Sequence, residues 1–258
     1  MKRGLVKSLW VVSTVFSVVG CGGGSSSVVE TSELPTEVEV AIDAPVSKLS
    51  QELTDTLAYM GNEERLAYDV YNALYEQYGT EQFTKIATNG EYKHITAVQE
   101  LIQKYKLSDD VSFTNIDLPA LGYVNTNIED MEAGTYDIAA IQKLYDDLVT
   151  QGSTSEIDAL KVGCIIEVVD VNDLNRDIAL AESEGATDIV TVFNFLRDGS
   201  YNHYWSFDKG LKNQNVADGC CSLGEEYCIT QENSTPETGQ GGGMGAGHGA
   251  GHGAGHSM

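Results

Sequence analysis

The sequence contains very little proline. Its 258 residues include only four: Pro35, Pro45, Pro119 and Pro236. Residues 46–118 and 120–235 therefore contain none. Proline inside a helix removes a backbone hydrogen bond and kinks the chain, so its absence permits helices of many turns. Strand signals are sparse as well, and the two proline-free stretches favour an all-α fold.

Apolar residues recur at helical spacing through both stretches, and glycines such as Gly79 and Gly152 mark ends. An irregular segment of about 30 residues, containing Pro119, separates the second expected helix from the third. We expect helices near residues 50–78, 81–106, 138–151, 154–181 and 186–211. The pattern predicts a four-helix bundle with one additional short helix.

Basic residues are also scarce. The chain has 15 Lys and Arg against 39 Asp and Glu, which gives a formal net charge of −24 at pH 7. Such a chain repels phosphate backbones and has no basic patch to offset the repulsion, so we expect no nucleic-acid partner. The acidity suits a solvated protein of the cell envelope, or one that attracts cations.

Long hydrophobic runs are missing except at the N-terminus. Residues 1–20 begin with the basic Lys2, Arg3 and Lys7, continue with a mainly apolar stretch and end in small residues before Cys21. This order is typical of a secretory signal peptide, and the cysteine at the cut resembles a bacterial lipoprotein signal. We expect a lipidated Cys21 that holds the protein on a membrane of the cell envelope, facing the periplasm or the outside. The alternatives are an ordinary signal peptide and a transmembrane anchor, for which the run is short.

Segments of biased composition flank a single domain. Residues 21–48 are acidic and begin with glycine and serine, so we expect a flexible tether. The bundle is expected at residues 49–213, and a Cys-containing extension at 214–232. Residues 233–258 are rich in glycine and histidine and cannot bury a core, which predicts a disordered tail.

Three histidines in this tail, His248, His252 and His256, recur at intervals of four residues. Histidine-rich tracts bind copper, nickel or zinc by composition, so the tail is a candidate secondary metal site. The alternative is a soluble spacer.

The five cysteines are few enough to consider one by one. Cys220, Cys221 and Cys228 follow the last expected helix of an exported chain, so we expect one disulfide, from Cys228 to Cys220 or Cys221. A thiolate metal site or redox pair is the less favoured alternative. Cys164 is expected to be a small buried thiol.

Histidine is rare in the expected domain, where only His94 and His203 occur. Glu91 and His94 lie three residues apart, so on a helix they project from one face, and the apolar stripe around them turns that face inward. Burying an unpaired charge costs several kcal/mol, and a metal ion removes that cost. Glu-x-x-His is the recurring ligand pair of di-iron helix bundles.

The other three long helices also carry a polar group in an apolar row. These groups are Glu64 in the first, Glu167 in the third and His203 in the fourth, with Asp170 close to Glu167. One such residue alone is more often a hydrogen-bonded core residue than a ligand. Together they form a mixed oxygen and nitrogen set suited to iron, manganese or zinc.

The ligand order resembles that of the ferritin-like di-iron superfamily. More narrowly, four segments resemble an uncharacterised ferritin-like family, the domain of unknown function numbered 2202: Glu63–Tyr71, Ala159–Gly163, Glu167–Asp170 and Gly199–His203. The resemblance covers about residues 50–210 and implies the bundle fold and a metal site, without a known activity. The superfamily's fourth helix usually carries Glu-x-x-His, whereas Ser200 stands three residues before His203 here. Either Asp170 replaces that carboxylate or the second metal binds weakly or not at all.

We expect one or two transition metal ions, iron or manganese favoured, and metal oxidation or oxygen and peroxide chemistry. No nicotinamide, flavin or haem motif occurs, so an enzyme would need an external electron donor. Tyr71 and Tyr92 are candidates for electron transfer, although tyrosines in such stripes are more often core residues. The alternatives are non-catalytic metal sequestration and a structural bundle with a degenerate site. Homo-oligomerisation stays open.

Overall fold

The computed structural model describes residues 33–105, 107, 132–136 and 138–230. The expected signal peptide, Cys21 and the His248, His252 and His256 tail lie outside the described residues, as does most of the irregular segment before the fourth expected helix.

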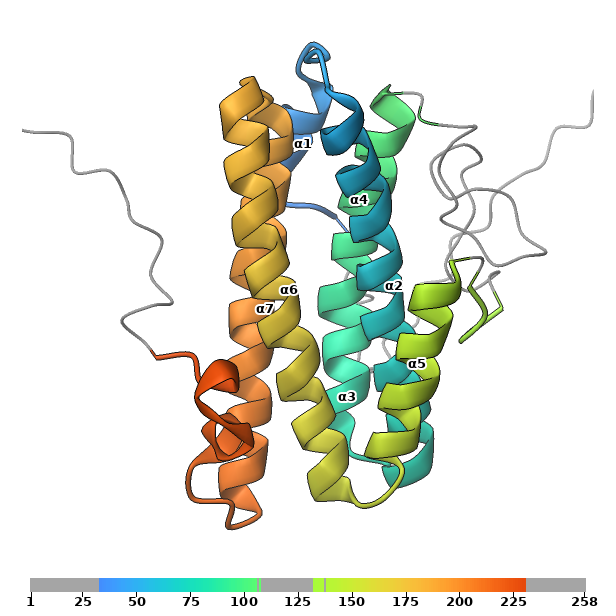
Figure 1. Cartoon of the computed structure of the whole chain (residues 1–258), viewed down its shortest axis with the longest axis vertical. Coiled ribbons are helices and arrows are strands. Elements are labelled where there is room, and N and C mark those ends of the chain that lie inside the picture. The colour runs from blue at the N-terminus through green and yellow to red at the C-terminus, as the bar shows by residue number, and fades with distance from the viewer. Residues whose placement is uncertain (1–32, 106, 108–131, 137, 231–258) are drawn as a thin grey trace, which may run out of the picture. The chain divides into compact units, whose positions relative to one another are not determined.

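The described residues are helical and contain no strand, which confirms the all-α fold class. Figure 1 shows the long helices running side by side. The α-helices are α1 (Thr36–Asp43), α2 (Gln51–Tyr78), α3 (Glu81–Ile86), α4 (Tyr92–Tyr105), α5 (Ala139–Gly152), α6 (Glu156–Glu184) and α7 (Thr187–Asn213). A π-helical segment, η1 (Ala87–Glu91), joins α3 to α4, and two 3₁₀ helices follow α7: η3 (Gly219–Leu223) and η4 (Glu225–Tyr227).

The two longest helices begin and end for the same local reasons. Ser50 accepts a hydrogen bond from the Leu53 N–H at the start of α2, and Ser155 accepts one from the Asp158 N–H at the start of α6. Both helices end at a glycine with positive φ, 67° at Gly79 and 71° at Gly185, a conformation that glycine adopts without strain. Capping explains the end at Gly79 that the sequence predicts, and it also sets the ends at Ser50, Ser155 and Gly185.

The four long helices pack against one another as a bundle. α2 contacts α4 and α6, α7 contacts α6 and α4, and α5 lies against α2 and α6 on the outside. The buried side chains divide into two apolar clusters. One is built around Leu57, Val98 and Phe193, and the other around Tyr71 and its aromatic neighbours. Glu64, His94 and His203 each fall between the stretches of their helices that supply the two clusters, while Glu167 lies at the end of the α6 stretch that supplies the second cluster. These polar residues therefore lie where the two clusters meet.

The expected tether differs from the structure at its C-terminal end. Helix α1 lies within residues 21–48 and contacts α7 and α4. Val38 and Leu34, which lies just before the helix, belong to the first apolar cluster, and Ala41 is buried as well. Their spacing of four and three residues places these side chains on one face of a segment that also carries Glu37, Glu39 and Asp43. The prediction of a flexible tether up to residue 48 was therefore wrong for α1.

The cysteines form two disulfides, Cys164–Cys220 and Cys221–Cys228. The second is one of the two pairings that the sequence left open. The expectation of a free thiol at Cys164 was wrong, because η3 folds back onto α6 and α7 and buries Cys220 completely. An Asp208 carboxylate oxygen accepts a hydrogen bond from the Cys220 N–H at 3.0 Å, which fixes η3 against α7.

Among the described residues, no helix combines the length and the apolar character needed to cross a membrane.

Candidate metal centre

The structure brings together five of the predicted ligands from the four long helices. They are Glu64 of α2, Glu91 at the end of η1, His94 of α4, Glu167 of α6 and His203 of α7. Glu64, Glu91, His94 and Glu167 are at most 2% exposed, and the side chain of His203 is 11% exposed. They form two groups of three residues, each with two carboxylates and one imidazole.

The first group consists of Glu64, Glu91 and His94. The Nδ1 atom of His94 lies 2.9 Å from Glu64 Oε2 and 3.1 Å from Glu91 Oε2. Each residue of the group offers one ligand atom, and these atoms all lie within 4.8 Å of one another. The separation is small enough for one ion to contact all three.

The second group consists of Glu91, Glu167 and His203. The Nδ1 atom of His203 lies 3.1 Å from Glu91 Oε1 and 3.5 Å from Glu167 Oε2. Glu91 therefore belongs to both groups and turns one oxygen to each histidine. The two imidazole rings lie with their centroids 5.4 Å apart, so the groups are immediate neighbours.

A local change of helix type precedes the shared carboxylate. In η1 the Tyr92 N–H bonds to the Ala87 carbonyl five residues back, which widens the helix for one turn. Such π segments are rare and often occur at functional sites, because they redirect the side chains that follow. The sequence did not reveal this segment, and Glu91 is its last residue.

Two glycines that the sequence analysis did not single out shape the histidine sites. A Cβ atom on Gly90 would lie 2.2 Å from His203 Nε2, and one on Gly199 would lie 2.2 Å from His94 Nε2. Each imidazole thus rests against a glycine of the facing helix. The sequence does contain a pattern that could have indicated these glycines. Gly90 stands four residues before His94, and Gly199 stands four residues before His203.

Asp170 lies outside both groups of three. One of its oxygens, Oδ2, accepts a hydrogen bond from the Ser200 hydroxyl, so α6 and α7 are joined at this point beside the two groups. The other oxygen, Oδ1, is buried without a hydrogen-bond partner. Burial and the nearby Glu64 raise the pKa of Asp170 well above its usual range.

Comparison with known proteins gives the family. Residues 53–225 match the family described as "Uncharacterized protein domain (DUF2202)". The chain belongs to this family. The matched region includes the five clustered residues, Asp170, Ser200 and both cysteines of the Cys164–Cys220 disulfide, and it ends before Cys228.

A protein of Methanocaldococcus jannaschii, "Uncharacterized protein MJ0754", is 34% identical to this DUF2202 chain over 176 residues, which is 68% of this chain and 84% of that protein. A crystal structure titled "hypothetical protein MJ0754 from Methanococcus jannaschii" is similar with a TM-score of 0.56 and 33% identity. It covers 67% of this chain and 86% of the crystallised one. Neither description states an activity.

The side chains of the DUF2202 site have pKa values far from their usual ranges. Burial raises the pKa of Glu64 to about 7 against the opposing effect of His94, and burial also raises the pKa of Glu167 to about 7. For His203, burial lowers the pKa, but Glu91 and Glu167 outweigh it and raise the pKa to about 10. The carboxylates thus favour positive charge at this position, which is what a metal ion supplies.

The donor set of the DUF2202 site fits a transition metal. Glu64 Oε1 is buried without a hydrogen-bond partner, and Glu91 Oε1 and His203 Nδ1 lie 3.1 Å apart without a well-formed hydrogen bond between them. Orphaned buried polar atoms are rare and costly in proteins. Carboxylate oxygens and imidazole nitrogens turned toward a common space form a ligand set that suits iron, manganese or zinc.

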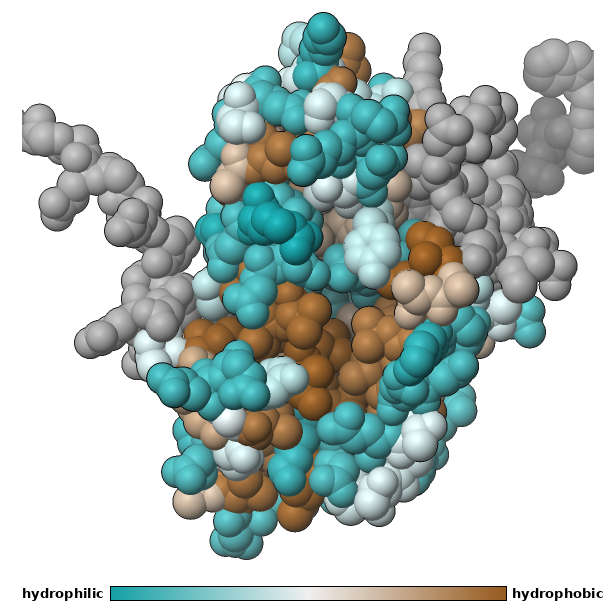
Figure 2. Space-filling model, in the orientation of Figure 1, coloured by the Kyte–Doolittle hydropathy of each residue, from teal (hydrophilic) through white to brown (hydrophobic). Residues whose placement is uncertain are grey.

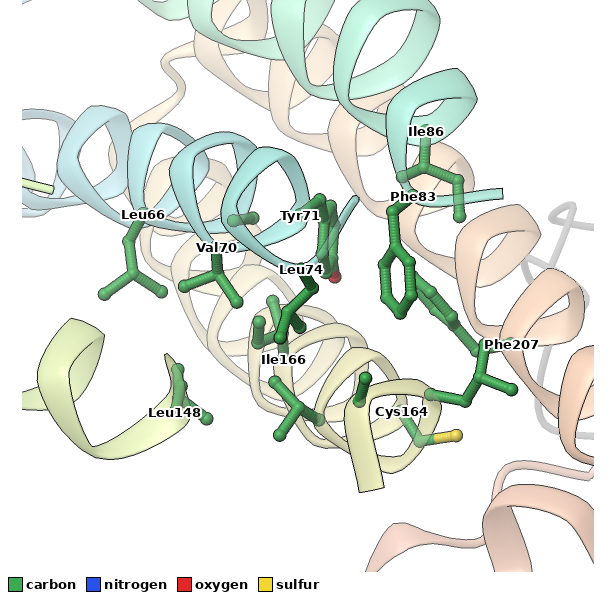
Figure 3. Close-up of a cluster of buried hydrophobic side chains, with 14 of the residues drawn as sticks. Leu66, Val70, Tyr71, Leu74, Phe83, Ile86, Leu148, Cys164, Ile166 and Phe207 are labelled. Atoms are coloured by element: carbon green, nitrogen blue, oxygen red, sulfur yellow. The ribbon is translucent and has the colours of Figure 1, made fainter. Parts of the chain in front are cut away.

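Tyr71 supports one ligand from outside the two groups. Its hydroxyl donates to Glu167 Oε1 at 2.5 Å, and its ring packs against Phe83 and Phe207 with centroids 6.2 and 5.2 Å away (Figure 3). This bond orients Glu167 toward His203. Tyr92, the other tyrosine considered, packs against the first apolar cluster.

Proposed function

We propose that this DUF2202 protein binds one or two transition metal ions, iron or manganese favoured, in the core of its helical bundle. The observation that carries the proposal is the sharing of Glu91 between two adjacent groups, each with its own histidine and second carboxylate. A shared carboxylate between two such groups is the arrangement of di-iron and di-manganese carboxylate bundles. We further propose that the fold is ferritin-like, on the order of the ligands along the chain.

The chain's residues have distinct roles in this proposal. Glu64 and His94 hold the first ion, and Glu167 and His203 hold the second, with one oxygen of Glu91 turned to each. Tyr71 fixes the orientation of Glu167, and Ser200 contributes its hydroxyl to Asp170 instead of a carboxylate to the metals. With one carboxylate fewer on α7, the set leaves coordination positions for a ligand from outside.

Iron or manganese, when bound, supplies one-electron redox chemistry at such a site. We therefore propose metal oxidation, or reduction of oxygen or peroxide, with electrons from an external donor. The bundle excludes bulk water from four of the five ligands, which are at most 2% exposed. Oxygen- or peroxide-dependent turnover separates this function from metal sequestration without catalysis.

We also propose that the protein is a lipoprotein of the cell envelope, attached through Cys21. The order of basic, apolar and small residues before Cys21 supports this, and two disulfides fit an oxidising compartment. Labelling with a radioactive fatty acid, with and without Cys21→Ala, tests it.

The experiment that tests metal binding is metal analysis by mass spectrometry of the chain that carries His248→Ala, His252→Ala and His256→Ala, so that the tail cannot contribute. We expect about two equivalents of iron or manganese, one for each group. Glu91→Ala should remove both and His203→Ala one. Asp177→Asn, a buried acid of α6 outside the site, is the matched control and should keep both. Absence of metal after reconstitution would overturn the proposal.

A further inference from the structure

A pocket with a cavity volume of about 100 Å³ opens onto the carboxylate side of the centre, between α2, α5 and α6. Its walls include Leu66, Leu148 and Ile166, one from each helix, and Figure 3 shows these three side chains extending from the three helices. The additional helix α5 thus has a specific place, because it closes one wall of a pocket that reaches the candidate centre.

The floor of the pocket is acidic while its walls are apolar. Five acidic side chains line it: Glu63, Glu64, Glu91, Glu167 and Asp170. No basic residue lines it, and the chain carries a formal net charge of −24. An anion that moved toward this floor would leave water and face carboxylates, and both effects oppose it. A hydrated cation would lose its water shell along the apolar walls.

The size of the pocket restricts what it can hold. A water molecule needs about 10–15 Å³ by the same measure, and an engineered apolar cavity of about 150 Å³ holds benzene. The pocket, at about 100 Å³, therefore accommodates a molecule of a few heavy atoms.

The mouth of the pocket lies in an apolar part of the surface. Leu144 of α5 is 38% exposed and Val169 of α6 is 42% exposed, and both line the pocket. Figure 2 shows brown apolar atoms gathered on this face, over α6 and α5. A mouth of this kind admits apolar solutes without desolvating polar groups.

The histidine side of the centre has a different character. A wider groove there is lined by His203, Gln82 and Ser206 together with the amines Lys85 and Lys209. Polar and charged solutes thus meet a separate surface, on the other side of the same ligands.

We propose that the pocket between α2, α5 and α6 binds a small uncharged molecule and delivers it to the carboxylate side of the metal centre. This inference rests on the proposed function for its metal, but the pocket itself exists in the polypeptide and is tested without metal. The substrate class is a neutral molecule smaller than benzene, and anions of the same size are excluded.

The first test uses xenon as the probe on the metal-free full chain. Methyl NMR signals of Leu66, Leu148 and Ile166 should shift with xenon pressure, while those of Leu57 and Leu101 in the first apolar cluster should not. Acetate, which is small and anionic, should leave all five unchanged. Absence of the xenon shifts, or equal shifts with acetate, would overturn the proposal whatever the metal content.

The second test uses nitric oxide on the chain reconstituted with ferrous iron. Val169→Trp fills the mouth from an exposed position and should fold, so we expect nitric oxide to combine at least about tenfold more slowly, equivalent to about 1.4 kcal/mol of added barrier. Val40→Trp, at a 65% exposed valine outside the pocket, is the matched control and should keep the wild-type rate.

The outcomes separate the two proposals. Equal nitric oxide rates in Val169→Trp and the wild type, with unchanged iron content, would show that the pocket is not the route. A chain that binds no iron but keeps the xenon shifts would refute the proposed function while leaving the pocket's preference for uncharged molecules established.

Discussion

Replacement of Gly199 by alanine should selectively disable the first metal group. The added Cβ would lie 2.2 Å from His94 Nε2, whereas non-bonded atoms pack at about 3.5–4.0 Å, so the imidazole must move by more than about 1 Å. The ring cannot retreat freely, because it is buried and packed edge-on against Phe195 at 5.4 Å. A shift of this size takes Nδ1 out of reach of an ion held by Glu64 and Glu91.

The expected magnitudes follow from two opposing effects. Alanine gains about 1 kcal/mol over glycine in a helix, while overpacking of a core costs about 1–3 kcal/mol. The metal-free Gly199→Ala chain should therefore be destabilised by up to about 2 kcal/mol. Affinity for the first ion should fall by about 10–100-fold, the usual effect of disturbing the support of a metal ligand.

The assay is metal titration in the background without tail histidines, together with urea unfolding of the metal-free chain. Gly90→Ala should affect the second ion instead, because its Cβ would meet His203. Gly210→Ala on the same helix is the control, since its Cβ meets the end of the flexible Gln82 side chain. The reasoning is refuted if Gly199→Ala binds both ions as tightly as Gly210→Ala does.

Three further predictions concern the second ligand group, the disulfides and a distant ion pair. Tyr71→Phe removes the donor to Glu167 Oε1, so the second ion should bind about 10–100-fold more weakly while the first is unaffected, as metal titration will show. Replacing Cys164 and Cys220 by alanine should lower the free energy of unfolding in urea by about 4 kcal/mol, because 56 residues separate them. Replacing Cys221 and Cys228, which are 7 residues apart, should lower it by about 2 kcal/mol. Equal losses would contradict the argument that the longer loop costs more entropy to close. Burial raises the pKa of Asp188, but hydrogen bonds from Lys104 and Tyr105 outweigh burial, so the net effect lowers the pKa. The ionised carboxylate therefore stabilises the fold above the ordinary aspartate pKa of about 3.9, and this stabilisation is lost as the pH falls. Asp188→Asn should therefore cost about 3 kcal/mol at pH 7, and the difference from wild type in unfolding free energy should shrink below about pH 4; a pH-independent difference would contradict this assignment.

The long helices could be predicted because each carries its own signals. Gly79 marked the end of α2 and the apolar stripes indicated the buried faces, whereas the serine caps and Gly185 after α6 were not used. The candidate ligands could be predicted for the same reason, since a glutamate or histidine in an apolar stripe is conspicuous. Helix α1 was missed because it is short and acidic, and its apolar face becomes visible only against α7 and α4.

Other features depend on contacts that no local pattern records. The Cys164–Cys220 bond joins residues 56 apart and requires η3 to return to α6. The π segment before Glu91 differs from an α-helix by one hydrogen-bond step, which side-chain periodicity does not resolve. The glycines at the histidines follow from how closely α4 and α7 approach, and that distance is a property of the packed bundle.

Ser200 of α7 links the two proposals. Ser200 holds Asp170 by a hydrogen bond, and Asp170 lines the apolar pocket with its second oxygen buried and unpartnered. Ser200 thus contributes no carboxylate from α7 and instead holds Asp170 of α6, which lines the pocket and lies outside both ligand groups. A small neutral molecule that enters the pocket would therefore arrive beside Glu64, Glu91 and Glu167 and next to a carboxyl group that belongs to neither ligand group.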